Sequence, residues 1–383
     1  MRRMFAGLTA VLMMLMLFSN ALCEDSYVVD DDEDTAPDPL HQAWAMMQRM
    51  TDEEKIYQLF YVSLEDLTGE ERSVALNDGN ALKKRPVGGV MLFGQNIESE
   101  DQLRELTDSL IRQASGAGLY PLFLGVDEEG GWVSRVANKL GYPLAPSPEE
   151  IGKTGDESLA LSAGRQIAGY LAPLGINMTF APPLDTMPDQ EKPGVQTYGR
   201  DPDAVYRMAS AMASGLRSGG VLPCFTHFPG HGEKEGTLYS NIGIQRTLDD
   251  LRELEFIPFQ KAISDHAEMI LVSHGKVRIM GEEDPSSCSN IMINGILRGQ
   301  LGYSGVVVTD ALRMQAITSV YKKGQECLAA LNAGADILLL PPDLDAAVSA
   351  IKRALATGEM TMERIEESVQ RILAVKIRMS VIQ

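Results

Sequence analysis

DAVYRMASAMASGLRSGGVLPCF, residues 203–225, contains a helix pattern followed directly by a strand pattern. Residues 203–218 are amphipathic and long enough for a helix, and Gly219-Gly220 is a typical helix stop. The five residues 221–225 form an apolar run with the length of a strand that is buried on both faces. A helix followed at once by a buried strand is the repeating unit of a parallel α/β fold.

The same unit recurs from residue 40 onward. The stretch Thr51-Asp-Glu-Glu54 predicts a helix start, because acids in the first turn favour the positive end of the helix dipole. Short apolar runs predict buried strands at 87–93, 121–126, 177–181, 221–225, 269–272, 306–308 and 336–340. Amphipathic segments predict helices at 100–117, 158–174, 203–218, 247–264 and 344–357.

This alternation predicts one α/β domain over residues 40–383, with a parallel sheet and right-handed crossovers. We expect a TIM-type (β/α)8 barrel with one strand weak or missing, because only seven strands are clear. A doubly wound open sheet is the alternative. No G-x-G-x-x-G follows the first strand and the chain contains no P-loop, so the sequence carries no nucleotide-binding signature.

The composition is that of an ordinary globular protein with a strong negative charge. The 383 residues include 34 basic and 53 acidic ones, giving a formal net charge of −19. We therefore expect no nucleic-acid partner, since binding the phosphate backbone needs clustered Lys and Arg. Cys224, Cys288 and Cys327 form no CxxC pair, and their odd number argues against a disulfide framework.

The N-terminal residues predict a targeting segment. The chain begins Met-Arg-Arg, residues 8–18 are apolar, and residues 21–23 resemble a signal-peptidase site. We expect a signal peptide over 1–23, an acidic disordered linker over 24–39, and a secreted or cell-surface protein without a stable membrane span. Lipidation of Cys23 is the alternative.

Acids and histidines follow five of the predicted strands. The carboxyl ends of the strands in a parallel barrel lie on one side, where the chemistry of such folds takes place. A single Asp at such a position is often only a helix cap, but five polar strand ends together predict a functional site. The residues concerned are Asp127, Asp185, His227, His274 and Asp310, with His231 close behind His227.

The segment His227-Phe-Pro-Gly-His-Gly232 is the most distinctive of these. Two histidines and three helix-breaking residues after a buried strand indicate a shaped loop. Histidine is a common zinc ligand, so a metal site is one interpretation. No HExxH or CxxC accompanies the segment, and we expect neither a metal nor another cofactor.

From about Met50 to the C-terminus, these motifs resemble glycoside hydrolase family 3, in its single-domain β-N-acetylhexosaminidase branch. The resemblance implies a TIM-type barrel that hydrolyses terminal β-linked N-acetylglucosamine in peptidoglycan or other glycan fragments. It rests on 50–60 (MTDEEKIYQLF), 88–93 (GGVMLF) with Asn96, 127–131 (DEEGG) with Val133 and Arg135, 175–185 (GINMTFAPPLD), 198–202 (YGRDP), 227–232 (HFPGHG), and 305–310 (GVVVTD) with Leu312 and Met314.

The resemblance also implies roles for the residues at the strand ends. Asp310 matches the nucleophile of a retaining mechanism, which forms a covalent glycosyl-enzyme that water later releases. Asp127 matches the sugar-binding aspartate, and His227 matches a histidine that contacts the sugar. For Asp310 the alternative is a helix cap. The same rim would be shaped by Asp185, His231 and His274.

Three sugar-binding positions depart from the family pattern. Thr226 stands where the family has a lysine, and Gln196 stands where it has an arginine. Both cations would have bound sugar hydroxyls or neighbouring carboxylates. Trp132 replaces a further arginine, and its ring is suited either to stacking on a sugar face or to packing on a neighbouring loop.

The acid/base loop departs further. Tyr239 and Asn241 stand where the branch has an Asp-His pair, and neither exchanges a proton readily near neutral pH. Glu233 or Glu235 would take over the acid/base role if burial raised its pKa. A carboxylate roughly 5 Å from Asp310 would suit a retaining mechanism. Two glutamates on a solvated loop without a catalytic role are the alternative.

Two functions from different classes follow. The first is a secreted, monomeric glycoside hydrolase of attenuated activity with a carbohydrate substrate. The second is a non-catalytic or weakly active carbohydrate-binding descendant of such an enzyme. A metal-dependent barrel hydrolase, which a chelator would inactivate, is a third reading.

Overall fold

The computed structural model describes residues 38–70, 73–116, 122–186, 196–230, 247–277 and 284–378. These belong to the unit Pro39–Gln383, apart from Asp38. The predicted signal peptide and residues 24–37 of the predicted linker lie outside the described residues. Within the described ranges, no helix is both long and apolar enough to cross a membrane.

The strands pair in parallel in two sheets. Within the described residues, one sheet has six strands in the order β11-β1-β2-β3-β6-β7, and another has three in the order β10-β9-β8. Isolated parallel bridges join Pro183 to Thr226 and Val308 to Ile337. The strands are β1 (Phe60–Ser63), β2 (Gly89–Met91), β3 (Phe123–Val126), β6 (Met178–Thr179), β7 (Leu222–Pro223), β8 (Phe225–Phe228), β9 (Met269–Val272), β10 (Val306–Thr309) and β11 (Leu338–Leu339), with the antiparallel pair β4 (Glu128–Gly130) and β5 (Val133–Ser134).

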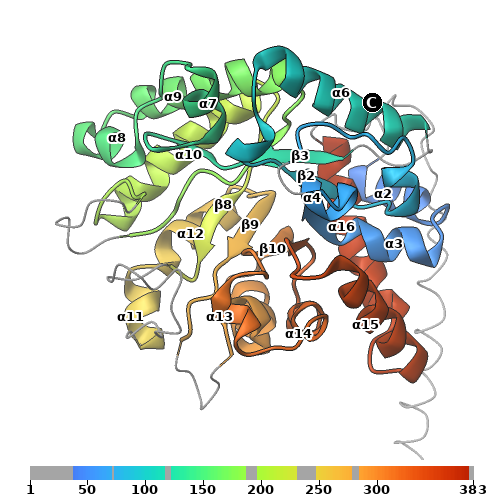
Figure 1. Ribbon diagram of the computed structural model, residues 1–383. Coiled ribbons are helices and arrows are strands. Elements are labelled where there is room, and N and C mark those ends of the chain that lie inside the picture. Colours follow the sequence, from blue (N-terminus) through green and yellow to red (C-terminus); the bar gives the residue numbers. More distant parts are fainter. Residues whose placement is uncertain are drawn as a thin grey trace, which may run out of the picture. The chain divides into compact units, whose positions relative to one another are not determined.

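Helices lie around the strands, with α6, α9, α10, α12 and α15 labelled outside them in Figure 1. The α-helices are α2 (Pro39–Met47), α3 (Asp52–Gln58), α4 (Leu64–Thr68), α5 (Ala81–Lys84), α6 (Glu100–Gly116), α7 (Arg135–Leu140), α8 (Pro148–Thr154), α9 (Glu157–Leu171), α10 (Pro202–Ser218), α11 (Leu248–Glu253), α12 (Phe256–Ser264), α13 (Gln315–Thr318), α14 (Gln325–Ala333), α15 (Leu344–Thr357) and α16 (Met362–Arg378). The 3₁₀ turns are η1 (Gly94–Asn96), η2 (Ala172–Leu174) and η3 (Ser286–Cys288), and η4 (Ile291–Gln300) is a π-helix.

The predicted α/β class and the parallel pairing are confirmed. Every predicted strand overlaps an observed one, and the run 221–225 contributes to both β7 and β8. The sequence missed β1, whose four residues are all buried. The apolar residues at the end of α3 run straight into β1, so periodicity alone does not separate the helix from the strand.

The predicted helix over 247–264 is wrong in one respect, because it is divided into α11 and α12. Pro258 lies in the first turn of α12. A proline lacks the N–H that would bond the preceding turn, and its ring clashes with the carbonyl four residues earlier, which is that of Leu254. The division therefore follows from a residue that the amphipathic pattern did not weigh.

Two predicted helix boundaries are confirmed by their hydrogen bonds. Thr51 caps α3, with its Oγ1 accepting from the Glu54 N–H at 3.2 Å and Glu54 Oε2 accepting from the Thr51 N–H at 2.7 Å. Helix α10 ends at Ser218, and Gly220 takes a positive φ of 81° that glycine adopts without strain. The sequence signals for start and stop therefore hold.

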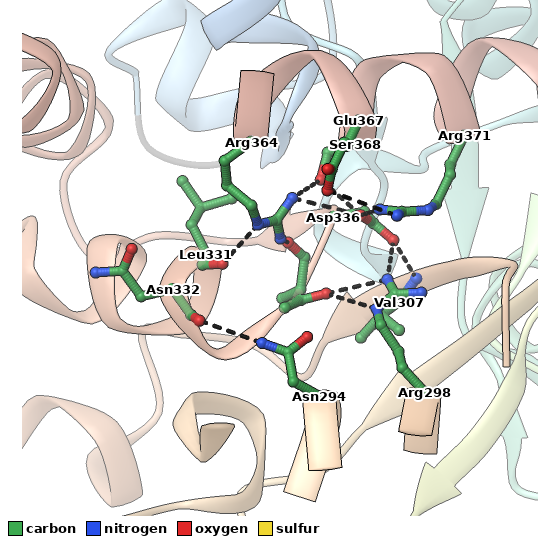
Figure 2. Close-up of polar contacts among 12 residues, drawn as sticks. Asn294, Arg298, Val307, Leu331, Asn332, Asp336, Arg364, Glu367, Ser368 and Arg371 are labelled. Atoms are coloured by element: carbon green, nitrogen blue, oxygen red, sulfur yellow. Dashed lines mark hydrogen bonds and ion pairs between the residues drawn. The ribbon is translucent and has the colours of Figure 1, made fainter. Parts of the chain in front are cut away.

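The amino end of β11 carries a buried carboxylate, Asp336, that is fully paired (Figure 2). Its Oδ1 accepts from Ser368 Oγ at 2.5 Å and from the Arg371 guanidinium at 2.9 Å. Arg364 donates to the same Ser368 Oγ at 2.7 Å. These three residues lie on one face of α16, because spacings of three and four residues return to the same side of a helix.

The second oxygen of Asp336 joins two further elements. Its Oδ2 accepts from the Val307 N–H of β10 at 2.9 Å and from the Arg298 guanidinium of η4 at 2.6 Å. Arg298 also donates to the Gly334 carbonyl at 3.0 Å. Asp336 thus ties β10, η4 and α16 together at the amino end of the strands.

Candidate active site

The five polar residues that follow predicted strands lie at the carboxyl end of the sheets. Asp127 follows β3, Asp310 follows β10, and His227 lies within β8. Electrostatic interactions link Asp127 to both Asp310 and His227. Asp185 is hydrogen-bonded to His227. The structure therefore brings together four of the predicted site residues from four different segments.

A glycine turn positions Asp127. Gly130 and Gly131 have φ angles of 94° and 57°, and a Cβ at Gly130 would lie 2.4 Å from the Pro146 carbonyl oxygen. Only glycine fits this turn, which folds β4 back onto β5. Thr179 Oγ1 fastens the same segment by donating toward the carbonyls of Val126 and Glu128, at 3.0 and 3.2 Å.

The carboxylate of Asp127 lies near the Arg135 guanidinium and interacts electrostatically with His227. Its Oδ2 lies 3.8 Å from the Arg135 guanidinium. Burial raises the pKa of Asp127, Arg135 and His227 lower it, and Asp310 adds to the rise. The resulting group accepts hydrogen bonds, as a sugar-binding carboxylate must.

Asp185, which is buried, pairs with His227, which is partly buried. Asp185 is 1% exposed, and its Oδ2 lies 2.8 Å from His227 Nδ1. Burial lowers the pKa of His227, but the Asp185 carboxylate outweighs this, and with Asp310 and Glu129 it raises the pKa to about 9. The imidazole is therefore a cation at neutral pH.

Asp310 is held through its backbone. The Asp310 N–H donates to the Val272 carbonyl at 2.8 Å, and its Oδ1 accepts from the Ala311 N–H at 2.7 Å. His274 supports the same turn, with Nε2 2.9 Å from the Ala311 carbonyl and Nδ1 2.7 Å from Ser287 Oγ. Both ring nitrogens of His274 are thus engaged within the protein, beside Asp310.

The three departures from the family pattern lie around this centre. Thr226 is fully buried, and its Oγ1 has no hydrogen-bond partner among the described residues. Gln196 uses its amide within the protein, donating from Nε2 to the Gly130 carbonyl at 3.1 Å. Trp132 is 58% exposed on the turn between β4 and β5.

Several predicted site residues lie outside the described residues. They are His231, Glu233, Glu235, Tyr239 and Asn241. In the part of the chain that is described, no group of three or more His, Cys, Asp or Glu side chains is arranged to hold a metal ion. Cys224, Cys288 and Cys327 are buried free thiols, in agreement with the prediction that they form no disulfide framework.

Glu129 is a site residue that the sequence reasoning missed. Its side chain is 8% exposed and interacts electrostatically with His227, Asp127 and Asp185. Side chains two residues apart on a strand point to the same side. The spacing of Glu129 from Asp127 was therefore a signal that could have placed it in the site.

Comparisons with known proteins agree with this arrangement. The sequence model of the "Glycosyl hydrolase family 3 N terminal domain" matches residues 51–375. The chain is 32% identical to "Beta-hexosaminidase LpqI" of Mycobacterium tuberculosis, with 84% of this chain and 82% of that protein covered. It is 33% identical to the "Beta-hexosaminidase" of Methylobacillus flagellatus, with 72% and 78% covered.

A solved structure gives the same result. The glycoside hydrolase family 3 β-N-acetylglucosaminidase from Paenibacillus sp. is 32% identical, with a TM-score of 0.79 over 87% of this chain. This chain spans 63% of the length of that protein. The chain belongs to glycosyl hydrolase family 3, and it is therefore a glycoside hydrolase by family.

Proposed function

We propose that the protein hydrolyses terminal β-linked N-acetylglucosamine with retention of configuration, and that Asp310 is the nucleophile. The observation that carries the proposal is the position of Asp310. It is a carboxylate at the carboxyl end of β10, oriented by the Ala311 N–H and close to Asp127 and the Asp185–His227 pair. The names of the related enzymes support the choice of sugar.

The proposed reaction has two steps. A carboxylate oxygen of Asp310 attacks the anomeric carbon while the bond to the leaving oxygen breaks and an acid protonates that oxygen. Water then attacks the same carbon, returns a proton to the acid/base and frees the Asp310 carboxylate. Asp127 and His227 would hold the sugar hydroxyls. Glu233 and Glu235 remain the proposed acid/base candidates.

We further propose that the two sheets are parts of one TIM-type barrel. The order of the strands supports this, because the last strand β11 pairs with the first strand β1 and, with the β4–β5 pair set aside, the strands within each sheet follow in sequence order. Isolated parallel bridges from Pro183 to Thr226 and from Val308 to Ile337 connect segments next to the two sheets. A doubly wound sheet would reverse its order at a switch point. We also propose that the protein is secreted or at the cell surface, that it is a monomer, and that it acts on glycan fragments.

The test follows hydrolysis of an aryl β-N-acetylglucosaminide and of a natural β-linked disaccharide by the full chain. Asp310→Asn should lower kcat/KM by at least about a thousandfold, because the covalent route is lost. Asp343→Asn is the matched control, since Asp343 also follows a strand but caps α15 by accepting from the Ala346 N–H at 3.0 Å. It should leave kcat/KM unchanged.

The two substrates separate the remaining outcomes. Hydrolysis of both would support an enzyme with a working acid, and Glu233→Gln and Glu235→Gln would identify it. Hydrolysis of the aryl glycoside alone would indicate an intact nucleophile without a proton donor. Sugar binding without turnover on either substrate would overturn the proposal in favour of a carbohydrate-binding protein.

A further inference from the structure

Two adjacent buried glutamates on β4 have opposite surroundings. Glu128 is fully buried and well paired, because its carboxylate accepts from two backbone N–H groups of α7 at 2.8 and 3.0 Å and from the Tyr170 hydroxyl at 2.8 Å. Glu129, its neighbour on the strand, projects to the other side, and its carboxyl interacts electrostatically with Asp127. Its Oε2 is buried without a hydrogen-bond partner in the described part of the chain.

The charges that face Glu129 come from four segments. They are Asp127 after β3, Asp185 after β6, His227 on β8 and Arg135 on α7. Each of the two cations already has a carboxylate, since Asp185 lies 2.8 Å from His227 and Asp127 lies 3.8 Å from Arg135. Glu129 is thus a third carboxyl beside two cation–carboxylate pairs.

The surroundings of Glu129 favour its protonated form. A buried carboxylate without hydrogen bonds or its own cation costs several kcal/mol, and a carboxyl group avoids this by keeping its proton. Burial raises the pKa of Glu129 to about 8, with His227 opposing the rise and Asp127 and Asp185 adding to it. Glu129 also affects the buried Tyr198. Burial is the first cause of the raised pKa of Tyr198, and the nearby Glu129 carboxyl is the second.

We infer that Glu129 is a positioning residue of the sugar site and acts as a neutral carboxylic acid. The inference rests on the proposed function. A neutral group here leaves the Asp185–His227 and Asp127–Arg135 pairs undisturbed, so that Asp127 offers its carboxylate to the sugar. An ionised Glu129 competes with Asp185 for His227 and repels Asp127. Sugar binding therefore requires the proton on Glu129 and weakens in mildly alkaline solution.

The test compares Glu129→Gln with Glu128→Gln in the full chain between pH 5 and 9. Glutamine imitates the neutral acid, so Glu129→Gln should keep the wild-type kcat/KM at pH 6. In this variant kcat/KM should not show the fall in alkaline solution that the ionisation of Glu129 causes. The wild-type value should fall about tenfold for each pH unit above the ionisation, through KM rather than kcat. Glu128→Gln should unfold more easily yet keep the wild-type fall in alkaline solution.

Two readouts do not depend on turnover. Infrared spectra of the wild type should contain the C=O band of a protonated carboxyl that disappears above about pH 8 and is absent in Glu129→Gln. In the unfolded chain this group ionises near its ordinary pKa of about 4.5, so the folded wild type loses stability as pH rises from there to about 8. The melting temperature of Glu129→Gln relative to wild type should rise over that interval.

The outcomes separate the two proposals. A wild type without hydrolysis would overturn the proposed function, while the infrared band and the pH dependence of N-acetylglucosamine binding would still test Glu129. A rise in KM near pH 8 that persists in Glu129→Gln, or an infrared band unaffected by the substitution, would overturn the role of Glu129. A Glu129→Gln enzyme that is inactive at pH 6 but melts as the wild type does would also overturn it, since the neutral amide would then not suffice.

Discussion

Buried carboxyl groups at the two ends of the strands differ in how fully they are hydrogen-bonded. At the amino end, Asp336 is fully buried and all its capacity is used by Arg298, Arg371, Ser368 and a backbone N–H (Figure 2). At the carboxyl end, Glu129 has a buried oxygen without a hydrogen-bond partner among the described residues. The first arrangement satisfies every acceptor, and the second leaves one available.

This difference separates stability from function. A buried carboxylate that is fully bonded holds elements together and has nothing left for a ligand. A carboxylate without its full set of partners costs stability, and natural proteins accept that cost mainly at sites where a ligand or a reaction uses the group. The same logic assigns the amino end of parallel strands to stability and the carboxyl end to chemistry.

The largest expected effect tests the amino end. Asp336→Asn removes the charge that neutralises Arg298 and Arg371 and sets an amide donor against the Val307 N–H. Breaking a buried pair by removing one partner costs about 3–5 kcal/mol. Urea unfolding should register that loss, while kcat/KM of the protein that remains folded should be unchanged.

The control for this prediction is Asp343→Asn, which removes a partly exposed charge but keeps a side-chain oxygen that can cap α15, so it should cost less than about 1 kcal/mol. If Asp336→Asn lowers the free energy of unfolding no more than the control does, water must solvate the arginines once the carboxylate is removed. A changed KM would mean that the two ends of the strands are coupled, and the division between stability and function would fail.

The sequence predicted much of this division between the two ends of the strands. What the sequence could not predict has a physical reason in each case. Alternating apolar runs gave the strands because a strand buried on both faces leaves a continuous apolar signal. The polar residues after those strands then marked one end of the sheets. The pairing of Asp185 with His227 was beyond the sequence, since it depends on how two distant segments approach each other in space.

The partners of Asp336 could not be predicted from the sequence either. In the sequence it is only the first residue of a predicted strand, and nothing local indicates its three arginine neighbours. Those arginines come from η4 and α16, and only the packed fold brings them together. Glu129 is different, because its spacing from Asp127 was readable in advance from the alternation of side chains along a strand.

An intermediate effect tests the carboxyl end. Asp185→Asn removes the partner that keeps His227 protonated, so burial should then lower the pKa of His227. In the wild type the folded pKa is about 9, against about 6.5 in the unfolded chain. The pair therefore stabilises the fold fully below pH 6.5, by about 3 kcal/mol, and loses that contribution as pH rises to about 9.

Urea unfolding at pH 6 and pH 9 measures this difference. The gap between wild type and Asp185→Asn should be large at pH 6 and nearly closed at pH 9. KM for the aryl glycoside should rise in the variant, because a neutral amide holds the His227 ring less strongly than the carboxylate does. A gap that is the same at both pH values would show that the pair contributes packing rather than charge.

The smallest expected effect concerns the two exposed tryptophans of the chain. Trp132 lies at the carboxyl end and is 58% exposed, and Trp44 lies on α2 and is 49% exposed. A ring that stacks on a sugar contributes about 1 kcal/mol, so Trp132→Ala should raise KM severalfold with kcat unchanged. Its unfolding free energy should stay within about 0.5 kcal/mol of wild type, as for most exposed positions.

The matched variant Trp44→Phe sharpens this test, because Trp132 is then the only tryptophan in the chain. Its fluorescence should change on addition of N-acetylglucosamine, and Trp132→Phe should keep most of the affinity because a ring remains to stack. A loss of stability in Trp132→Ala without a change in KM would assign the ring to packing on the neighbouring loop. The carboxyl end would then bind its sugar through its carboxylates and histidine alone.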